Sequence, residues 1–220
     1  MLDAQCDLIR SRDIIHPQAV ARTASELAKP DAVFVLDTGL TLWSGNWIRQ
    51  SGTQRIIGSF NNAAVGTALG QANGIQALDR KRQVIVLTGD GGMNMLLGEF
   101  MTAVQHRLPL KIVIFNNSAL GLITLEAESV GLLPFRRAIE FPNPDFAAIA
   151  RACGAHGFTA KQPGVLAPVM HEAFAVDGPA IVDGVVAADE MPNLPHVDID
   201  QAAKYALAKI KEAVAHVRGS

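Results

Sequence analysis

The chain has 220 residues, of which 49% are hydrophobic and 18% are charged, and its formal net charge is −2. This composition is typical of a globular domain that buries a full core, and the small net charge excludes the basic signature of a nucleic-acid-binding protein. The sequence contains no run of about 18 apolar residues and no N-terminal signal peptide, and its two cysteines lie far apart, so we expect a cytoplasmic protein without disulfides.

The N-terminal part of the chain predicts a linker, a helix and a first strand. Residues 1–15 mix charged and apolar side chains without a clear partner in the chain, as a linker from a missing upstream domain would. A helix is expected over residues 16–29, because a proline stands in its first turn and another proline follows its end. The apolar strand 32–36 then leads into the loop Asp37-Thr38-Gly39.

Residues 40–78 predict a short second strand and a helix of small residues. Trp43 and Trp47 lie four positions apart on one face of a helical turn, where they either pack or form the wall of a binding cleft. A brief strand at 55–58 precedes the turn 59–62 and a helix expected over 63–78. The small side chains of this helix permit close approach to the sheet or to a partner helix. We therefore expect the tryptophan segment and this helix to belong to a subunit interface.

The centre of the chain predicts two adjacent parallel strands joined by a crossover helix. Residues 84–88 and 111–117 are apolar, β-branched runs, and apolar residues at helical spacing lie between them. Asp90, within Gly89-Asp90-Gly91-Gly92, and Asn117 then follow the carboxyl ends of neighbouring strands, at the edge where open α/β sheets bind ligands. One carboxylate and one amide oxygen suit Mg²⁺, which completes its coordination with water and ligand phosphates.

Other roles for these polar residues stay open at this point. Asp90 could cap the helix that follows it, and Asn117 could form a turn. A Rossmann fingerprint fails, because Asn94 stands where the third glycine is required. The sequence also contains neither a Gly-Lys-Ser/Thr phosphate-binding loop nor a His-Glu-x-x-His zinc motif.

The C-terminal half adds two further strands. Residues 118–131 form a short, glycine-bounded segment that we expect directly over the metal. Asn143-Pro144-Asp145 is expected to cap a helix that ends at 153–154, and a helix ending near Val176 separates the strands 157–160 and 180–186. Six strands separated by helices predict an α/β fold with a doubly wound, mostly parallel six-stranded sheet and helices on both faces.

The tail, residues 189–220, predicts an extended linker and a C-terminal helix. We expect this helix to dock on its own or a neighbouring subunit, with weak lipid contact as the alternative. The apolar residues of the helix share one stripe: Ile199, Ala203, Ala206, Leu207, Ile210, Val214 and Val217.

The central motif resembles the thiamine-diphosphate motif. Gly89-Asp90-Gly91, followed at this spacing by Asn116-Asn117, is similar to that motif, and Ser59-Phe60-Asn61-Asn62 and Asp37-Thr38-Gly39 fit the same family. The sequence from Leu87 to Leu122 is most similar to pyruvate oxidase and the quinone-linked pyruvate dehydrogenase. The resemblance covers nearly the whole chain, but only the C-terminal, diphosphate-binding domain of the family, expected over 16–188.

The resemblance implies how thiamine diphosphate and Mg²⁺ would be held. The metal ligands would be Asp90, Asn117 and the backbone carbonyl of Ala119. Val65 would wedge the cofactor into its bent shape, although relatives of the oxidase type carry a larger residue there and a core valine is the alternative. The implied cofactor-binding residues are Asp37, Thr38, Gly39, Ala63, Ala64, Val65, Gly89, Asp90, Gly91, Gly92, Asn117, Ser118, Ala119, Leu120, Gly121, Leu122 and Ile123.

The resemblance further implies part of an enzyme acting on a 2-oxo acid, most like the oxidative decarboxylation of pyruvate. Acetolactate-synthase-type carboligation and a non-catalytic Mg-diphosphate-binding module are the alternatives. No catalytic residue is expected within the chain, because the activating glutamate belongs to a pyrimidine-binding domain on another chain or a missing segment. FAD belongs only to a complete enzyme, whose flavin domain is absent here. The expected assembly is a homo-oligomer that contacts the inner membrane face only for quinone reduction.

Overall fold

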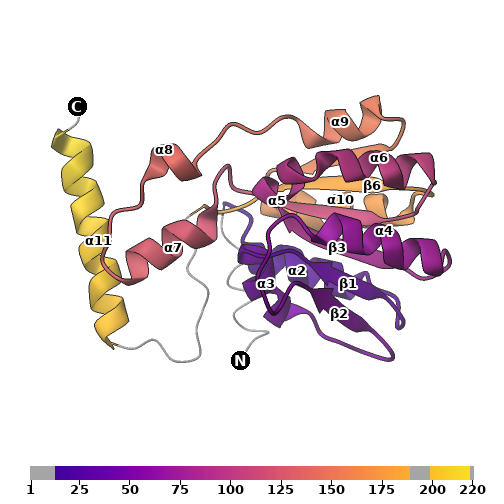
Figure 1. Cartoon of the computed structure of the whole chain (residues 1–220), viewed down its shortest axis with the longest axis horizontal. Coiled ribbons are helices and arrows are strands. Elements are labelled where there is room, and N and C mark those ends of the chain that lie inside the picture. Colours follow the sequence, from indigo (N-terminus) through magenta and orange to yellow (C-terminus); the bar gives the residue numbers. More distant parts are fainter. Residues whose placement is uncertain (1–12, 189–198, 219–220) are drawn as a thin grey trace.

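One parallel sheet organises the chain. The computed structural model describes residues 13–188 and 199–218, and in these ranges six parallel strands form a sheet of order β2-β1-β3-β4-β6-β5 (Figure 1). The predicted six-stranded α/β fold is thus confirmed. In chain order the strands are Val33–Leu36 (β1), Arg55–Gly58 (β2), Val84–Gly89 (β3), Lys111–Asn116 (β4), His156–Ala160 (β5) and Ala180–Val185 (β6).

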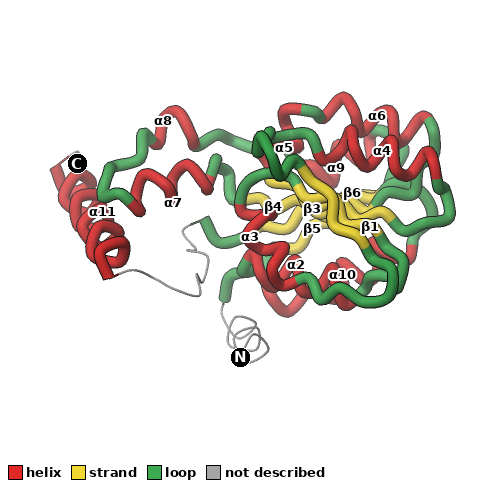
Figure 2. Tube along the Cα trace, turned by 60° about the horizontal axis from the view of Figure 1, so that its bottom comes forward, coloured by secondary structure: helices red, strands yellow, loops and turns green. Residues whose placement is uncertain are grey.

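Helices cover both faces of the sheet, as Figure 2 shows. Successive side chains of a strand point to opposite faces. Phe34 and Leu36 of β1 therefore pack against one helical layer, whereas Val33 and Val35 pack against the other. The first layer consists of Pro17–Glu26 (α2), Leu40–Ser44 (α3), Gly45–Trp47 (η1) and Pro163–Ala175 (α10). The second layer consists of Ala68–Leu78 (α4), Leu97–Gln105 (α6) and Phe146–Ala152 (α9).

The central strands place the polar residues of interest at one edge. β3 and β4 are adjacent and parallel, with Ile85 opposite Lys111 and Gly89 opposite Phe115. Their side chains are buried almost throughout because helices lie on both faces, which accounts for the apolar and mostly β-branched residues in the middle of both strands. A six-residue helix, Asp90–Met95 (α5), follows β3 directly. Asp90 and Asn117 consequently lie at the same edge of the sheet, as predicted.

The helix expected over 63–78 begins later than predicted. α4 starts at Ala68, and residues 63–67 form a turn in which Ala63 and Gly66 have φ angles of 47° and 85°. The buried carboxylate of Asp37 accepts the Gly66 N–H at 2.9 and 3.1 Å. This contact holds the backbone of Gly66 outside the helical range, so the helix cannot begin before it.

The environments of Ile15 and Trp47 bear on two further expectations. Ile15 is not an unpartnered linker residue, because it is buried and pairs in parallel with Val186, and its carbonyl accepts the Ala187 N–H at 2.9 Å. Trp47 packs in the core formed by α2, α10 and the sheet, so its own side chain is not exposed for a subunit contact. Packing, the simpler of its two predicted roles, is confirmed. The predicted interface formed by the rest of the tryptophan segment and the small-residue helix stays a prediction. Cys6 and the linker at 189–198 lie outside the described residues.

Three helices form an arm that extends from the carboxyl edge of the sheet (Figure 1): Gly121–Ser129 (α7), Arg136–Ile139 (α8) and Ile199–Arg218 (α11). The segment 118–131 therefore leads away from the predicted metal position beyond its first residues. α11 docks on α7, but Leu207, Ile210 and Val214 of its predicted stripe are exposed. None of the described helices is long and apolar enough to cross a bilayer.

Candidate functional site

A cavity of about 440 Å³ opens at the carboxyl edge of the sheet, next to β3 and β4. Four separate segments meet in its wall: the loop after β1, the turn at 63–65, the β3–α5 junction, and the β4–α7 junction. The residues of the wall are Thr38, Gly39, Leu40, Thr41, Ala63, Val65, Gly89, Asp90, Gly91, Gly92, Met95, Phe115, Asn117, Ala119, Leu120, Gly121, Leu122, Ile123 and Glu126.

Most of the residues predicted from the sequence line this cavity, and three do not: Asp37, Ala64 and Ser118. Five residues of the wall were not predicted from the sequence. Two of these could have been predicted from their positions in the sequence. Leu40 directly follows the predicted loop, and Glu126 lies four positions after Leu122 on the same helical face. No local pattern distinguishes the other three from core or surface residues: Thr41, Met95 and Phe115.

Asp90 is the only carboxylate besides Glu126 in the wall, and it is almost completely buried. Burial raises its pKa, and the hydrogen bonds that it accepts oppose this shift. Its carboxylate accepts the Gly91 N–H at 2.8 Å, the Ser118 N–H at 2.6 Å and the Asn143 amide at 2.7 Å. The N-cap of α5 is Gly89, so Asp90 occupies the first position of the helix rather than the N-cap position.

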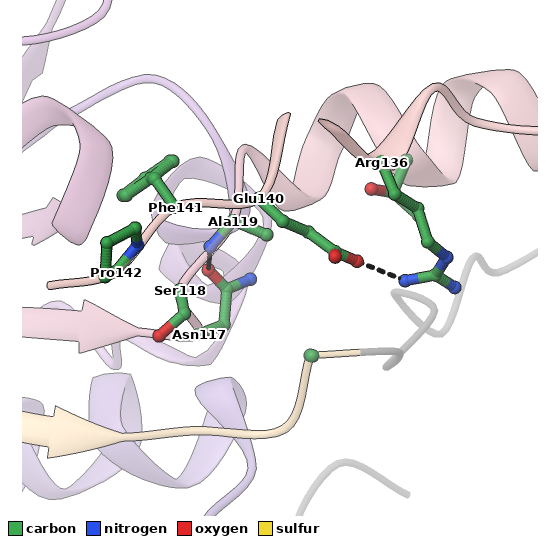
Figure 3. A pocket seen from close by; sticks show the side chains of 9 residues that line it. Asn117, Ser118, Ala119, Arg136, Glu140, Phe141 and Pro142 are labelled. Atoms are coloured by element: carbon green, nitrogen blue, oxygen red, sulfur yellow. Dashed lines mark hydrogen bonds and ion pairs between the residues drawn. The ribbon is translucent and has the colours of Figure 1, made fainter. Parts of the chain in front are cut away.

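Asn117 and Ala119 lie beside each other after β4. The Asn117 Oδ1 accepts the Ala119 N–H at 3.2 Å (Figure 3), which is the turn predicted as an alternative role. An amide oxygen has two lone pairs, so this bond leaves one for another partner. Among the described residues, no group of three or more His, Cys, Asp or Glu side chains is placed to hold a metal ion. A cation here would therefore rely on one carboxylate with neutral oxygens, which is the mode in which Mg²⁺ retains waters and phosphates.

The glycines of the cavity fall into two groups. A Cβ atom at Gly39 or Gly89 would meet nothing within 4 Å, so their bare backbone faces open space. A Cβ at Gly91 would lie 2.8 Å from Leu120, and one at Gly92 would lie 2.1 Å from the Asp37 carboxylate. The first group leaves room for a ligand, and the second allows three segments to approach one another. The open space beside Gly39 and Gly89, next to the N-terminus of α5, fits a diphosphate.

Asp37 lies behind the wall, where it connects segments. Besides the Gly66 N–H, its carboxylate accepts the Thr88 hydroxyl at 2.8 Å and the Thr38 N–H at 3.0 Å. Burial raises its pKa, and the hydrogen bond from Thr88 is the largest opposing effect. The residue thus fixes the loop after β1 to β3 and to the turn at 63–67.

Val65 lies at the mouth of the cavity with 40% of its surface exposed. This position excludes the alternative of a core valine. Its predicted role as a wedge under the cofactor stays a prediction.

A second cavity, of about 380 Å³, is also lined by the Asn117–Ala119 segment (Figure 3). Arg136 is its cationic residue, but this guanidinium is paired with both Glu140 and Glu212. The two carboxylates neutralise the arginine, which leaves no net positive charge for an anion.

Comparison with known proteins identifies relatives of the chain. The family described as thiamine pyrophosphate enzyme, C-terminal TPP binding domain, matches residues 37–184. A thiamine pyrophosphate-containing protein of Bacillus subtilis is 33% identical over 198 residues, which are 90% of this chain and 34% of that protein.

Two named enzymes are more distant relatives. Pyruvate oxidase of Lactiplantibacillus plantarum is 29% identical, over 85% of this chain and 31% of the enzyme. The catabolic acetolactate synthase of Raoultella terrigena is 26% identical, over 76% and 30%. The chain therefore spans about a third of the length of these relatives.

Proposed function

The chain belongs to the thiamine pyrophosphate enzymes, as their C-terminal TPP-binding domain, and on this premise we propose that it supplies the diphosphate and Mg²⁺ anchor of an enzyme that oxidatively decarboxylates pyruvate. The observation that carries the proposal is the meeting of bare glycine backbone, a buried carboxylate and an amide oxygen in one cavity. Thiamine pyrophosphate and thiamine diphosphate are the same compound.

Each part of the wall has a proposed task. Asp90, Asn117 and the Ala119 carbonyl would hold Mg²⁺, and the Gly92 N–H would donate to the diphosphate, since the Gly91 N–H is bonded to Asp90. Leu120 to Ile123 would line the thiazolium side and exclude water. When bound, thiamine diphosphate supplies a nucleophilic carbon and an electron sink for the decarboxylation of a 2-oxo acid. The protein contributes position and alignment rather than acid–base chemistry.

The pyruvate oxidase relative and the amino-acid sequence around the central motif support oxidative decarboxylation. Carboligation of the acetolactate-synthase type is the second candidate, because enzymes of that name cover a similar share of the chain. A flavin spectrum with reduction of an electron acceptor, measured on the complete enzyme, separates the first reaction from acetolactate formation. FAD would then belong to a domain other than this one.

The cofactor also needs a partner on its pyrimidine side. The activating glutamate of the proposed enzyme would come from a pyrimidine-binding domain, contributed by another chain or another segment, and the working assembly would be a homo-oligomer. Without that partner, the chain would be a Mg-diphosphate-binding module that holds the cofactor and does not turn over.

Calorimetry of thiamine diphosphate binding, with and without Mg²⁺, tests the proposed anchor. We expect binding that requires Mg²⁺, and we expect Asp90→Ala to weaken it by more than the roughly 100-fold upper value typical of residues that only support a metal ligand. Asp31→Ala, which removes an exposed carboxylate before β1, is the matched control and should bind normally. Binding by the wild-type chain that is independent of Mg²⁺, or unchanged affinity in Asp90→Ala, would contradict the assignment.

A further inference from the structure

We propose that Asn143 is a positioning residue that orients the carboxylate of Asp90 toward a bound cation; this inference rests on the proposed function. Asn143 is far from Asp90 in the sequence, in the loop between α8 and α9. Its amide nitrogen nevertheless donates to the Asp90 Oδ2 at 2.7 Å. No motif of the sequence predicts this contact.

The orientation of the Asn143 amide is determined by its neighbours. Its nitrogen has two hydrogens, and two acceptors lie at short distance: the Asp90 Oδ2 and the Asn116 Oδ1, the latter at 2.9 Å. The Asn116 nitrogen in turn donates to the Asp183 carboxylate at 2.9 Å. An ionised carboxylate only accepts hydrogen bonds. Asp90 accepts from Asn143, and Asp183 accepts from Asn116. The amide nitrogens of Asn143 and Asn116 must therefore face these carboxylates, which leaves each amide a single consistent orientation.

The other end of Asn143 is also held. Its Oδ1 accepts the Asn94 amide of α5 at 2.9 Å. Because both ends of the side-chain amide are bonded, Asn143 cannot rotate without breaking several hydrogen bonds. The residue thus connects α5 to the carboxyl edge of β4 through side chains alone.

This network distinguishes the two oxygens of Asp90. Oδ2 accepts from both the Ser118 N–H and Asn143, whereas Oδ1 accepts from the Gly91 N–H. Each carboxylate oxygen offers about two lone-pair sites. Oδ1 therefore retains more capacity for a cation than Oδ2, and Asn143 helps to decide which oxygen is presented. Outer contacts of this kind commonly tune metal ligands.

The loop does not need Asn143 for its own structure. Asp145, two residues later, caps α9 by accepting the Ala148 N–H at 2.8 Å. The loop is fixed to the β4–α7 junction by backbone bonds, including the Phe141 N–H to the Ser118 carbonyl at 3.1 Å. Because these contacts hold the loop, the Asn143 side chain is available to bind Asp90. Asp145→Ala is a matched control, because it changes the same loop without removing a contact to Asp90.

The test compares the Mg²⁺ requirement for thiamine diphosphate binding in the wild-type chain, Asn143→Ala, Asn143→Asp and Asp145→Ala. We expect Asn143→Ala to need about 10–100-fold more Mg²⁺ for half-maximal binding. Asn143→Asp keeps the shape but replaces the donor with an acceptor, so its requirement should rise at least as much. Asp145→Ala should lose thermal stability and keep the wild-type requirement.

A second readout needs no cofactor. The N–H groups of Ser118 and Gly91 are both bonded to Asp90, so their hydrogen exchange should accelerate in Asn143→Ala and not in Asp145→Ala. Absence of Mg²⁺-dependent binding by the wild-type chain would overturn the proposed function and this inference with it. Normal wild-type binding, with either Asn143 variant folded and matching the wild-type Mg²⁺ curve, would overturn the inference alone.

Discussion

Two glycines of the cavity wall serve different purposes: one is required by the packing of the fold, and the other leaves space for a ligand. Gly89 and Gly92 are three positions apart, yet a Cβ at Gly89 meets open space and one at Gly92 meets the Asp37 carboxylate at 2.1 Å. The first position has an ordinary extended backbone, with φ −74° and ψ 160°. An alanine at Gly89 is thus compatible with the fold, whereas at Gly92 it is not.

We expect Gly92→Ala to lower the free energy of unfolding by about 1–3 kcal/mol, as overpacking does. Gly89→Ala should unfold like the wild type but bind thiamine diphosphate more weakly, because its methyl group would occupy the cavity. Urea unfolding and calorimetry on both variants check this contrast. Equal stability of the two variants would contradict the predicted clash at Gly92.

Lys111, at the opposite end of β4 from the cavity, makes the stability depend on pH. It is buried, and its ammonium donates to the carbonyls of Val176 and Gly178 at 2.6 and 3.2 Å. Burial lowers its pKa from 10.5 to about 8, although Asp177 opposes the shift. Between these values the unfolded chain binds more protons at this lysine than the folded chain does. The contribution of Lys111 to stability therefore rises with pH, and the cost of its charge is fully present below about pH 8.

The measurement is the free energy of unfolding of the wild-type chain and Lys111→Met at several values between pH 7.5 and 10. The difference, wild type minus variant, should increase by up to about 1 kcal/mol per pH unit. Comparison with the variant removes the titration of other groups. Parallel pH profiles would show that Lys111 keeps an ordinary pKa.

Among the elements, α7 connects the cavity to the C-terminal helix. Its first turn lines the cavity, and Glu128 near its end is fully buried. The Glu128 Oε1 binds the Lys209 ammonium of α11 at 2.7 Å, and its Oε2 has no partner among the described residues. Lys211 adds a bond to the Gly131 carbonyl at 2.9 Å. The docked α11 thus supplies the positive charge of Lys209 that compensates the buried carboxylate of Glu128.

Removing the ammonium in Lys209→Met should release α11 from α7. A buried carboxylate that loses its partner costs about 3–5 kcal/mol, and undocking exposes it to water and avoids this cost. We expect faster hydrogen exchange of α11 amides, while exchange in β3 and β4 is unchanged. The double variant Glu128→Leu/Lys209→Met removes both charges and should restore the protection. Full protection of α11 in the single variant would argue against this dependence.

The sequence predicted those elements whose signals are local. The β-branched runs at 84–88 and 111–117 were sufficient to place Asp90 and Asn117 at one edge, since parallel strands share their carboxyl ends. The start of α4 could not be predicted, because the Asp37 carboxylate that holds Gly66 lies far away in the sequence. The contact of Asn143 with Asp90 has the same long-range character. The exposure of the α11 stripe was not predicted, because charged residues of this helix, including Lys209 and Glu212, make its contacts with α7 and α8.

At the scale of the whole molecule, the cavity opens to the surface beside apolar side chains. Val65, Met95 and Ile123 line its wall and are each at least 40% exposed. Apolar groups in such a position suit contact with a further domain rather than with water. The predicted homo-oligomer and the pyrimidine-binding partner stay predictions.

We expect the isolated chain to bind the cofactor in the presence of Mg²⁺ without decarboxylating pyruvate. Addition of a purified pyrimidine-binding domain that carries the activating glutamate should restore turnover, since acid–base assistance of this kind contributes about 10²–10⁴ in rate. Pyruvate-dependent release of CO₂ is the assay, and a glutamate-to-glutamine variant of the added domain is the control. Rapid turnover by the 220-residue chain alone would contradict this division of the site.

The pairing of Ile15 with Val186 has a mechanical consequence. It brings the two ends of the described body, near residues 13 and 188, together as parallel neighbours, each with a buried side chain. Tension applied from the N-terminal side of Ile15 and the C-terminal side of Val186 would pull the two segments past each other along their length. The bond between the Ala187 N–H and the Ile15 carbonyl and the two buried side chains would then be loaded in shear, at the same time. Tension applied at these two points would load this junction before it reached the central strands that carry the cavity.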